Sequence, residues 1–288
     1  IKSLLIHATS SISGHPFEGG SGILNIAKAI TYGIETSING NDRWEEEVIP
    51  DFTAISTLSV RNNHNYSVRV SIEIETPSDL EYNNYLDLSQ FMFSNSIVVP
   101  QFNTTNVSIK FSSVNARPGI YGSTIIISAN SSEILRIPVS ITIPLLDDGM
   151  INGTINNGGS CTDTNPCGDW IYYLIRHHNG TSLTVKLEWE NSQNDLDLFL
   201  FTSDGIFIKA SNASSTTQEL ITAEKIVYDR YWLIVHGKSV IGNVPYNLTI
   251  SYGSKLNIEP SRVQNTYLSY ETPNLKFNIT NDAFPKYN

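Results

Sequence analysis

Short stretches in which apolar and polar residues alternate recur along most of the sequence after its first 50 residues. In SVRVSIEIE, Val68, Val70, Ile72 and Ile74 fall on one face and polar residues on the other, which is the period of a half-buried β-strand. Similar stretches, separated by turn residues, are FTAISTLSV, FMFSNSIVV, NVSIKFS, IYGSTIIISA, ILRIPVSITI, SLTVKLEWE, LDLFLF, IFIKA, YWLIVH and YNLTISY. The pattern predicts a mainly β fold built from antiparallel sheets.

The spacing of these stretches also predicts how the chain is divided. With 288 residues, it exceeds a typical domain of about 100–150 residues, so two domains with flanking pieces are expected. Residues 46–145 predict a first antiparallel β-sandwich, and residues 146–252 predict a second sandwich or jelly roll. Residues 253–288 hold two strand candidates, KLNIEP and NLKFNIT, which are too few to close a sandwich. We expect this tail to pair with the preceding domain, to exchange strands with another chain, or to begin a further domain.

The first 45 residues differ from the rest because two apolar patterns there fit a helix. In IKSLLIHATS (residues 1–10) and ILNIAKAI (residues 23–30), apolar residues recur at helical spacing. A glycine-rich loop, SGHPFEGGSG, separates them. We therefore expect two short helices, whose apolar sides need a partner that this sequence does not supply.

Composition narrows the classes of partner. The net charge is −10 at pH 7, with only 18 Lys and Arg, which argues against nucleic acid and against an anionic membrane surface. No apolar run approaches the roughly 20 residues that span a bilayer. The start, IKSLLIHATSS, lacks the basic region and sustained apolar core of a signal peptide. Charged residues are 16% of the chain, below the usual quarter or so, and the polar surface that Ser, Thr and Asn provide instead suits an extracellular protein.

The two cysteines, Cys161 and Cys167, lie in the turn-rich segment GGSCTDTNPCGDW. Half of a metal site is the alternative to a disulfide, but no second Cys or His pair has matching spacing. We favour a structural disulfide, which would contribute about 2 kcal/mol at most in so short a loop. Such a bond indicates an oxidising compartment.

Asn-x-Ser/Thr sequons are candidate glycosylation sites if the protein is secreted. Most of them flank turn signals, where a glycan can be accommodated. They begin at Asn65, Asn103, Asn106, Asn130, Asn152, Asn179, Asn212, Asn247 and Asn278.

Asp195 and Asp197 are the strongest candidates for a metal site. They stand two residues apart in a predicted strand, so they share the face opposite Leu196, Leu198 and Leu200. Two carboxylates on one face repel each other unless they are solvated or bridged by a cation, and oxygen ligands suit Ca²⁺. Three further oxygen ligands could join them from nearby turns: Asn194, Asp204 and Asp169. A solvated polar face and a calcium site both remain open, and no other cofactor is expected.

Other chemistry-bearing side chains give weaker signals. Phe199 and Phe201 would face outward with Asp197, where they could bind sugar or protein, or be covered by the linker or tail. His177 and His178 are adjacent, so on a strand they face opposite ways. The remaining histidines, including His236, are isolated in the sequence and support no site.

Residues near the N-terminus follow a known family pattern. A helix end of the form L-I-x-x-A/T is followed by a G-x-G-x-(I/L/V)-(N/D)-x-x-x-A turn and a last helix. The matching residues are Leu5, Ile6, Ala8, Thr9, Gly20, Gly22, Ile23, Leu24, Asn25 and Ala29. On these residues, the first 35 positions resemble the end of the catalytic domain of subtilisin-like serine proteases (subtilases).

Two later segments extend this resemblance. PGIYG at 118–122 and IPV at 137–139 make residues 50–145 similar to the fibronectin type III-like domain of many long subtilases. Residues 147–252 resemble the pre-peptidase C-terminal (PPC) domain. The signals there are Asp169-Trp170, Asn194 to Leu198, and Tyr246 to Ile250. Together the three similarities cover about 250 of the 288 residues.

The resemblance implies a non-catalytic C-terminal region of a secreted subtilase. Its partner would be an upstream catalytic domain, braced by the first β domain, while the PPC-like domain would aid secretion, stability or surface attachment. A subtilase also needs Asp, His and Ser in a triad. Gly180-Thr181-Ser182-Leu183 imitates the nucleophile motif but continues into an alternating strand instead of a helix. We therefore expect this chain to be catalytically inert.

Two other functions are compatible with the same sequence. The chain could be a structural subunit of a glycosylated extracellular filament or surface layer that assembles by strand exchange with its own copies. It could also be an adhesion module that binds glycans or matrix proteins. A monodisperse monomer would argue against the filament. Glycan binding unchanged in an Asp195→Ala, Asp197→Ala variant would argue against calcium-dependent adhesion.

Overall fold

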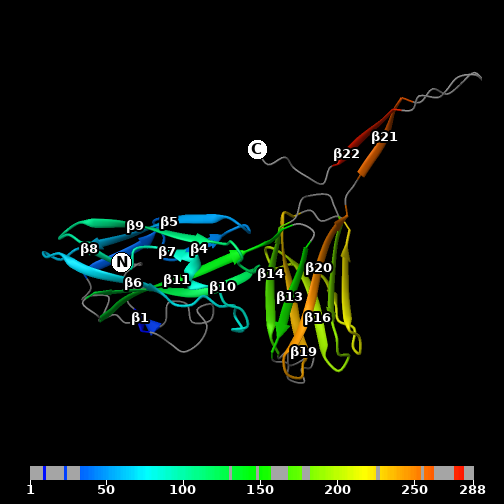
Figure 1. The fold of residues 1–288 in the computed structure, drawn as a ribbon, viewed down its shortest axis with the longest axis horizontal. Helices are drawn as coiled ribbons and strands as arrows, with labels where there is room; N and C mark the ends of the chain where they lie inside the picture. Colours follow the sequence, from blue (N-terminus) through cyan, green and yellow to red (C-terminus); the bar gives the residue numbers. More distant parts are fainter. Residues whose placement is uncertain are drawn as a thin grey trace, which may run out of the picture. The chain divides into compact units, whose positions relative to one another are not determined.

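The structure, a computed structural model, is built almost entirely from β-strands (Figure 1). It describes residues 9–10, 23–24, 33–129, 132–146, 149–156, 168–176, 182–224, 228–253, 256–262 and 276–281. Within these residues there is no α-helix, and one short 3-10 helix, η1, spans Leu88–Gln90. The mainly β prediction is confirmed. Backbone packing divides the chain into unit 1, Ile1–Leu145 with Asp169–Leu174, and unit 2, Leu146–Gly168 with Ile175–Asn288.

The helices predicted near the N-terminus are wrong where the structure describes them. Thr9–Ser10 (β1) and Ile23–Leu24 (β2) form an antiparallel pair, with Thr9 opposite Leu24 and Ser10 opposite Ile23. β-branched Thr and Ile favour extended backbone, and an apolar pattern only eight to ten residues long does not separate helix from strand. The rest of residues 1–32 lies outside the described part of the chain.

Unit 1 contains two facing sheets. The first has the order β3-β5-β9-β7 and the second β4-β11-β10-β6-β8. The first sheet comprises β3 (Ile34–Ile38), β5 (Thr53–Asn62), β9 (Thr104–Ser112) and β7 (Phe91–Met92). The second comprises β4 (Trp44–Glu47), β11 (Ser132–Ile143), β10 (Gly119–Ala129), β6 (Val68–Ile74) and β8 (Ser96–Val99).

Two details of unit 1 differ from the sequence-based expectation. β3 lies within residues 1–45, so sandwich strands start at Ile34 and not after residue 45. Its five residues alternate buried and half-buried, but so short a segment gives little periodic signal. β4 runs parallel to β11, with Trp44 opposite Val139, in a sheet expected to be antiparallel.

The core of unit 1 lies between its sheets because alternate residues of each strand point inward. Val68, Val70 and Ile72 of β6 are at most 4% exposed, as the SVRVSIEIE pattern predicts. Trp44, Tyr121 and Phe111 are among the largest fully buried side chains.

Tyr121 ties a loop to the core of unit 1. Its ring is 1% exposed, and its hydroxyl donates a 2.9 Å hydrogen bond to the carbonyl oxygen of Arg117, four residues upstream. Burial is the main reason why the pKa of the Tyr121 hydroxyl is raised. This geometry is the tyrosine corner of Greek-key sandwiches, in which a tyrosine hydroxyl fastens the chain where it crosses between sheets.

We expect Tyr121→Phe to lower the free energy of unfolding by about 1–2 kcal/mol, because the ring stays packed while the Arg117 carbonyl loses a buried donor. Urea unfolding at pH 7 measures the difference. Tyr85→Phe, at a side chain that is 57% exposed, is the matched control and should change the value by less than about 0.5 kcal/mol. Equal effects of the two substitutions would contradict the corner's role.

Two further sheets, formed mostly by strands of unit 2, have the orders β12-β14-β19-β16-β17 and β13-β20-β15-β18. The first comprises β12 (Leu145–Leu146), β14 (Trp170–Arg176), β19 (Arg230–Ser239), β16 (Asp195–Thr202) and β17 (Phe207–Ser211). The second comprises β13 (Gly149–Ile155), β20 (Val244–Gly253), β15 (Ser182–Trp189) and β18 (Gln218–Ala223).

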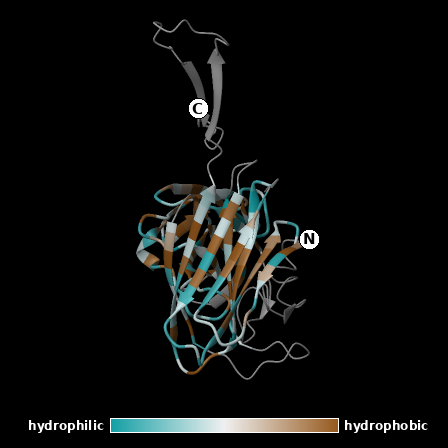
Figure 2. Cartoon of the chain, turned by 90° about the vertical axis from the view of Figure 1, so that its right-hand side faces the viewer, coloured by the Kyte–Doolittle hydropathy of each residue, from teal (hydrophilic) through white to brown (hydrophobic). Residues whose placement is uncertain are grey.

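The second core again comes from alternate residues. Leu183, Val185 and Leu187 of β15 are fully buried, and Leu196, Leu198 and Leu200 face them from β16. Figure 2 shows hydrophobic and hydrophilic residues interspersed along the strands. Later in the sequence, β21 (Leu256–Arg262) and β22 (Lys276–Asn281) pair with each other in antiparallel register. The two tail strands are therefore partners of one another.

Candidate functional site

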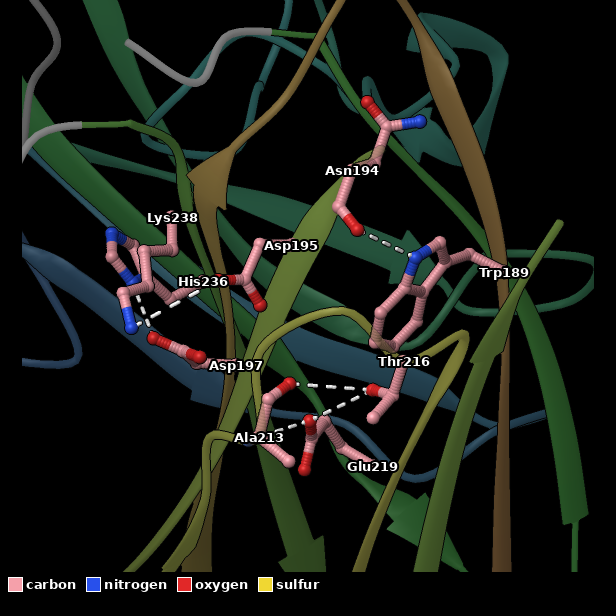
Figure 3. A network of polar contacts seen from close by, with 9 residues as sticks. All are labelled: Trp189, Asn194, Asp195, Asp197, Ala213, Thr216, Glu219, His236 and Lys238. Carbon is pink, nitrogen blue, oxygen red and sulfur yellow. Dashed lines mark hydrogen bonds and ion pairs between the residues drawn. The ribbon is translucent and has the colours of Figure 1, made fainter. Parts of the chain in front are cut away.

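The candidate site lies at the start of β16, where polar side chains of β16 and β19 meet on the face turned away from the core. In the antiparallel register, Asp197 is opposite His236 and Leu198 is opposite Val235. Because neighbouring residues of a strand face opposite ways, the inward Leu198 puts Asp197 on the outer face. Figure 3 shows His236 and Lys238 beside Asp195 and Asp197.

The carboxylates face side-chain nitrogen atoms of β19, but at long distances. Nδ1 of His236 lies 3.5 Å from Oδ2 of Asp197, and these side chains are only 5% and 6% exposed. Nζ of Lys238 lies 3.9 Å from Oδ2 of Asp195. A register shift in the β16–β19 pair makes Asp195 face Ser239 while Leu196 faces Gly237. Lys238 is the extra residue, which the bulge brings beside Asp195.

The cluster carries unsatisfied buried acceptors. Within the described residues, Oδ1 of Asp195 and Oδ1 of Asp197 are buried and accept no hydrogen bond. Burial raises the pKa of Asp195, and the negative charge of Asp197 raises it further. Lys238, the Ser214 hydroxyl and His236 act in the opposite direction. Partial burial and the neighbouring carboxylate thus make ionisation of Asp195 less favourable than it is in water.

This pKa direction predicts how stability depends on pH. An acid whose pKa is raised on folding keeps its proton in the folded state at pH values where the unfolded chain has lost it. Ionised Asp195 therefore reduces stability above its raised pKa and has no such effect below its ordinary value of 3.8. We expect Asp195→Asn to raise the melting temperature at pH 7 and to lose that advantage as the pH falls to 3. Asp204→Asn, at an exposed carboxylate, is the control, and an Asp195→Asn effect independent of pH would contradict the assignment.

Glu219 of β18 holds the loop next to this cluster. Its side chain is 2% exposed and accepts hydrogen bonds from the Ser211 hydroxyl, from the backbone N–H of Ala213 at 2.9 Å and from Thr216 Oγ1 at 3.4 Å. Two of these donors, Ala213 and Thr216, belong to residues 212–217, the connection between β17 and β18 (Figure 3). Glu219 thus positions the loop that carries the Ser214 hydroxyl beside Asp195.

The structure does not bring the five predicted calcium ligands together. Oδ1 of Asn194 accepts a 2.9 Å hydrogen bond from the Ile241 backbone, so it already braces a loop. Asp204 follows the far end of β16, roughly 20 Å from Asp195 along an extended strand. Its Oδ1 accepts a hydrogen bond from the Thr202 hydroxyl. Asp169 belongs to unit 1 and accepts a 3.1 Å hydrogen bond from Asn83.

In the described part of the chain, no group of three or more His, Cys, Asp and Glu side chains is arranged to hold a metal ion. Calcium at Asp195 and Asp197 therefore stays a prediction. His236, Lys238 and Glu219 are polar residues of this region that sequence reasoning missed. His236 lies about 40 positions from Asp197 in the sequence, so only the β16–β19 register reveals their contact.

Of the remaining predicted sites, which are the sequons, the two cysteines and Ser182, some lie within the described residues and others lie outside them. Six of the sequon asparagines have exposed side chains: Asn65, Asn103, Asn106, Asn152, Asn212 and Asn247. Asn152 and Asn247 are directly opposite each other on β13 and β20, and both line a shallow hollow together with Glu188 and Glu190. Cys161, Cys167, Asn130 and Asn179 lie outside the described residues, as does the side chain of Asn278. Ser182, from the imitation of a nucleophile motif, begins strand β15.

Comparisons with known proteins give only distant likenesses. No family model matches, and no curated protein matches. A family 123 glycoside hydrolase from Clostridium perfringens has 12% identity over 39% of this chain and 27% of that chain, with a TM-score of 0.35. The secreted serine protease VesC from Vibrio cholerae has 14% identity over 77% of this chain and 51% of that chain, with a TM-score of 0.39. The pre-peptidase C-terminal domain of a Bacillus anthracis collagenase has 12% identity over 38% of this chain and 92% of that domain, with a TM-score of 0.28.

The chain thus spans about a quarter and about half of the first two proteins. At these TM-scores the likenesses assign no family. In the described residues, the single helix, η1, has neither the length nor the apolar character to cross a membrane.

Proposed function

We propose that this chain is a non-catalytic accessory region of a secreted subtilisin-like protease. The observation that carries the proposal is that two β units with their own cores follow a segment whose residues resemble the end of a subtilase catalytic domain. In this role unit 1 braces the catalytic domain, and unit 2 aids secretion, stability or surface attachment. The β1–β2 pair does not reproduce the helices of that family, so the N-terminal resemblance rests on the residues alone.

The polar cluster of β16 and β19 supports a structural role. Asp195 and Asp197 already face Lys238 and His236 of the same chain, and Glu219 is surrounded by donors of its own loop. Glu219 thereby orders residues 212–217 without needing a ligand. An extracellular location follows from the same proposal and fits the exposed sequons.

Reactivity toward a serine-directed fluorophosphonate, together with casein hydrolysis, tests the inert assignment on the 288-residue chain. We expect neither labelling nor turnover. The control is Ser182→Ala, at the serine whose sequence context imitates a nucleophile, and it should behave like the parent chain. Labelling of the parent chain that Ser182→Ala abolishes would overturn the proposal. Light scattering distinguishes the filament alternative from an accessory role, because long particles in solution would favour the filament.

A further inference from the structure

One end of unit 1 presents exposed aromatic side chains on two loops that a single buried residue holds together. The loops are residues 63–67, between β5 and β6, and residues 100–103, between β8 and β9. Asn62, the last residue of β5, is 0% exposed. Its Nδ2 donates to the carbonyl oxygens of Tyr66 at 2.7 Å, Val99 at 3.1 Å and Pro100 at 3.2 Å.

The same asparagine also fixes the other sides of the two loops. Its Oδ1 accepts a 2.9 Å hydrogen bond from the backbone N–H of His64. Its own backbone N–H donates to the carbonyl oxygen of Asn103 at 2.8 Å. A fully buried amide with bonds in so many directions is a strong constraint on backbone position. The loops are therefore preorganised, and the side chains that they expose are held in place.

Two of the exposed side chains at this end are aromatic, Tyr66 and Phe102. The rings of His64 and Tyr66 stack at 4.9 Å with an interplanar angle of 20°, and Tyr66 is 55% exposed. Phe102 is 69% exposed. Its backbone φ is +51°, a left-handed conformation that disfavours bulky residues. A strained, water-exposed phenylalanine contributes little to the core, and such positions are found where a surface has a binding role.

The residue after Phe102 is a modification candidate. Asn103 begins the sequon Asn103-Thr104-Thr105, and its side chain is exposed. Its Oδ1 accepts a 2.7 Å hydrogen bond from the backbone N–H of Thr104. In the described part of the chain, no hydrogen bond of its Nδ2, the atom to which a glycan is joined, is found. Phe102 and a glycan on Asn103 would therefore be neighbours on a rigid turn.

We propose that Asn103 carries an N-linked glycan whose first sugar packs against the ring of Phe102. This inference rests on the secretion that the proposed function implies. A pyranose presents C–H groups with partial positive charge on one face, and an aromatic ring presents a negative face, so the two attract each other while both lose water. The glycan is the occupant that covers the exposed ring.

The joining reaction needs a donor from the secretory pathway. Nδ2 of Asn103 attacks the anomeric carbon of an oligosaccharide linked through phosphate or pyrophosphate to a lipid carrier. The new N–C bond forms as the C–O bond to the phosphate breaks, the lipid phosphate leaves with the electron pair, and one amide proton passes to a base of the transferase. The chain supplies the acceptor and the transferase of the host supplies catalysis.

The test is a double-mutant cycle on the 288-residue chain produced by a yeast secretory host. Glycopeptide mass spectrometry gives the occupancy of Asn103, and calorimetry gives the melting temperature of the parent chain, Asn103→Gln, Phe102→Ala and the double variant. We expect Asn103 to be occupied and Asn103→Gln to lower the melting temperature by about 3–6 °C, the shift typical of one lost contact in a unit of this size. In the Phe102→Ala background the same substitution should change it by less than about 1 °C.

Phe52→Ala is the matched control, because Phe52 is 58% exposed and precedes the opposite end of β5. With Phe52→Ala, the full effect of Asn103→Gln should persist. Phe102→Gly removes the left-handed strain, so it is a second variant that can fold if Phe102→Ala does not. In the Phe102→Gly background, Asn103→Gln should again change the melting temperature by less than about 1 °C. An unoccupied Asn103, or an Asn103→Gln effect that is the same with and without Phe102, overturns the inference. Neither outcome changes the proposal that this chain accompanies a protease. That proposal is tested independently, by labelling the native polypeptide upstream of Ile1.

Discussion

Replacing Gly153 with alanine should destabilise unit 2 by about 3 kcal/mol, the upper range for an overpacked core. Gly153 of β13 pairs with Tyr246 of β20, and a Cβ atom at this glycine would lie 1.9 Å from Cζ and 2.2 Å from Cε2 of the tyrosine ring. The ring is 2% exposed, and on its other side Tyr246 pairs with Trp189 of β15. Because the ring is buried, it must shift from its packed position to make room for the added Cβ atom.

Urea unfolding followed by tryptophan fluorescence measures this loss. Gly205→Ala is the control, because Gly205 has a φ of +85° and nothing within 4 Å of its added Cβ. It should cost only about 1 kcal/mol, from backbone strain alone. In a Tyr246→Val background, Gly153→Ala should cost much less than in the parent, since the clashing ring is gone. Equal costs in the two backgrounds would show that the Tyr246 ring is not the reason for the glycine.

A loss of about 3 kcal/mol is also expected for Glu219→Ala. The substitution removes the acceptor for the Ser211 hydroxyl, the Ala213 N–H and Thr216 Oγ1, and leaves these donors without that partner beside a new cavity. Residues 212–217 should consequently be cleaved faster by proteases. Glu219→Gln, which keeps one acceptor oxygen, should give an intermediate loss.

The control for Glu219 is Glu190→Ala, at an exposed glutamate of the same unit, which should change stability by less than about 0.5 kcal/mol. The free energy of unfolding in urea at pH 7 and the cleavage rate at residues 212–217 are the two measurements. A stable Glu219→Ala variant with an uncleaved loop would contradict the role of this carboxylate.

Sequence periodicity predicts the strands well because it reports burial directly. The alternation in SVRVSIEIE places Val68, Val70 and Ile72 in the core, as the structure has them. The same logic places Asp195 and Asp197 opposite Leu196, and this arrangement is also present. A period of two is a local property of the chain, so a single sequence contains it.

The parts that sequence reasoning missed depend on contacts between distant segments. Nothing local places His236 beside Asp197, because their meeting requires the register of β16 against β19. Likewise, the sequence alone shows Glu219 as one more polar residue in a strand. Its role becomes visible only in the structure, where the preceding loop donates hydrogen bonds to it. Apolar spacing near Ile23 fitted a helix as well as a strand, and pairing with β1 decided for the strand. Tertiary contacts settle what a short pattern leaves open.

If these β units accompany a subtilase catalytic domain, the native polypeptide that contains them carries a reactive serine in that domain. This polypeptide should be isolated from its source with an antibody to residues 33–253, labelled with a fluorophosphonate and mapped by mass spectrometry. We expect a polypeptide larger than the 32.0 kDa of this chain, with the label on a serine that precedes Ile1. A polypeptide that contains these residues but takes up no label upstream of Ile1 would contradict it.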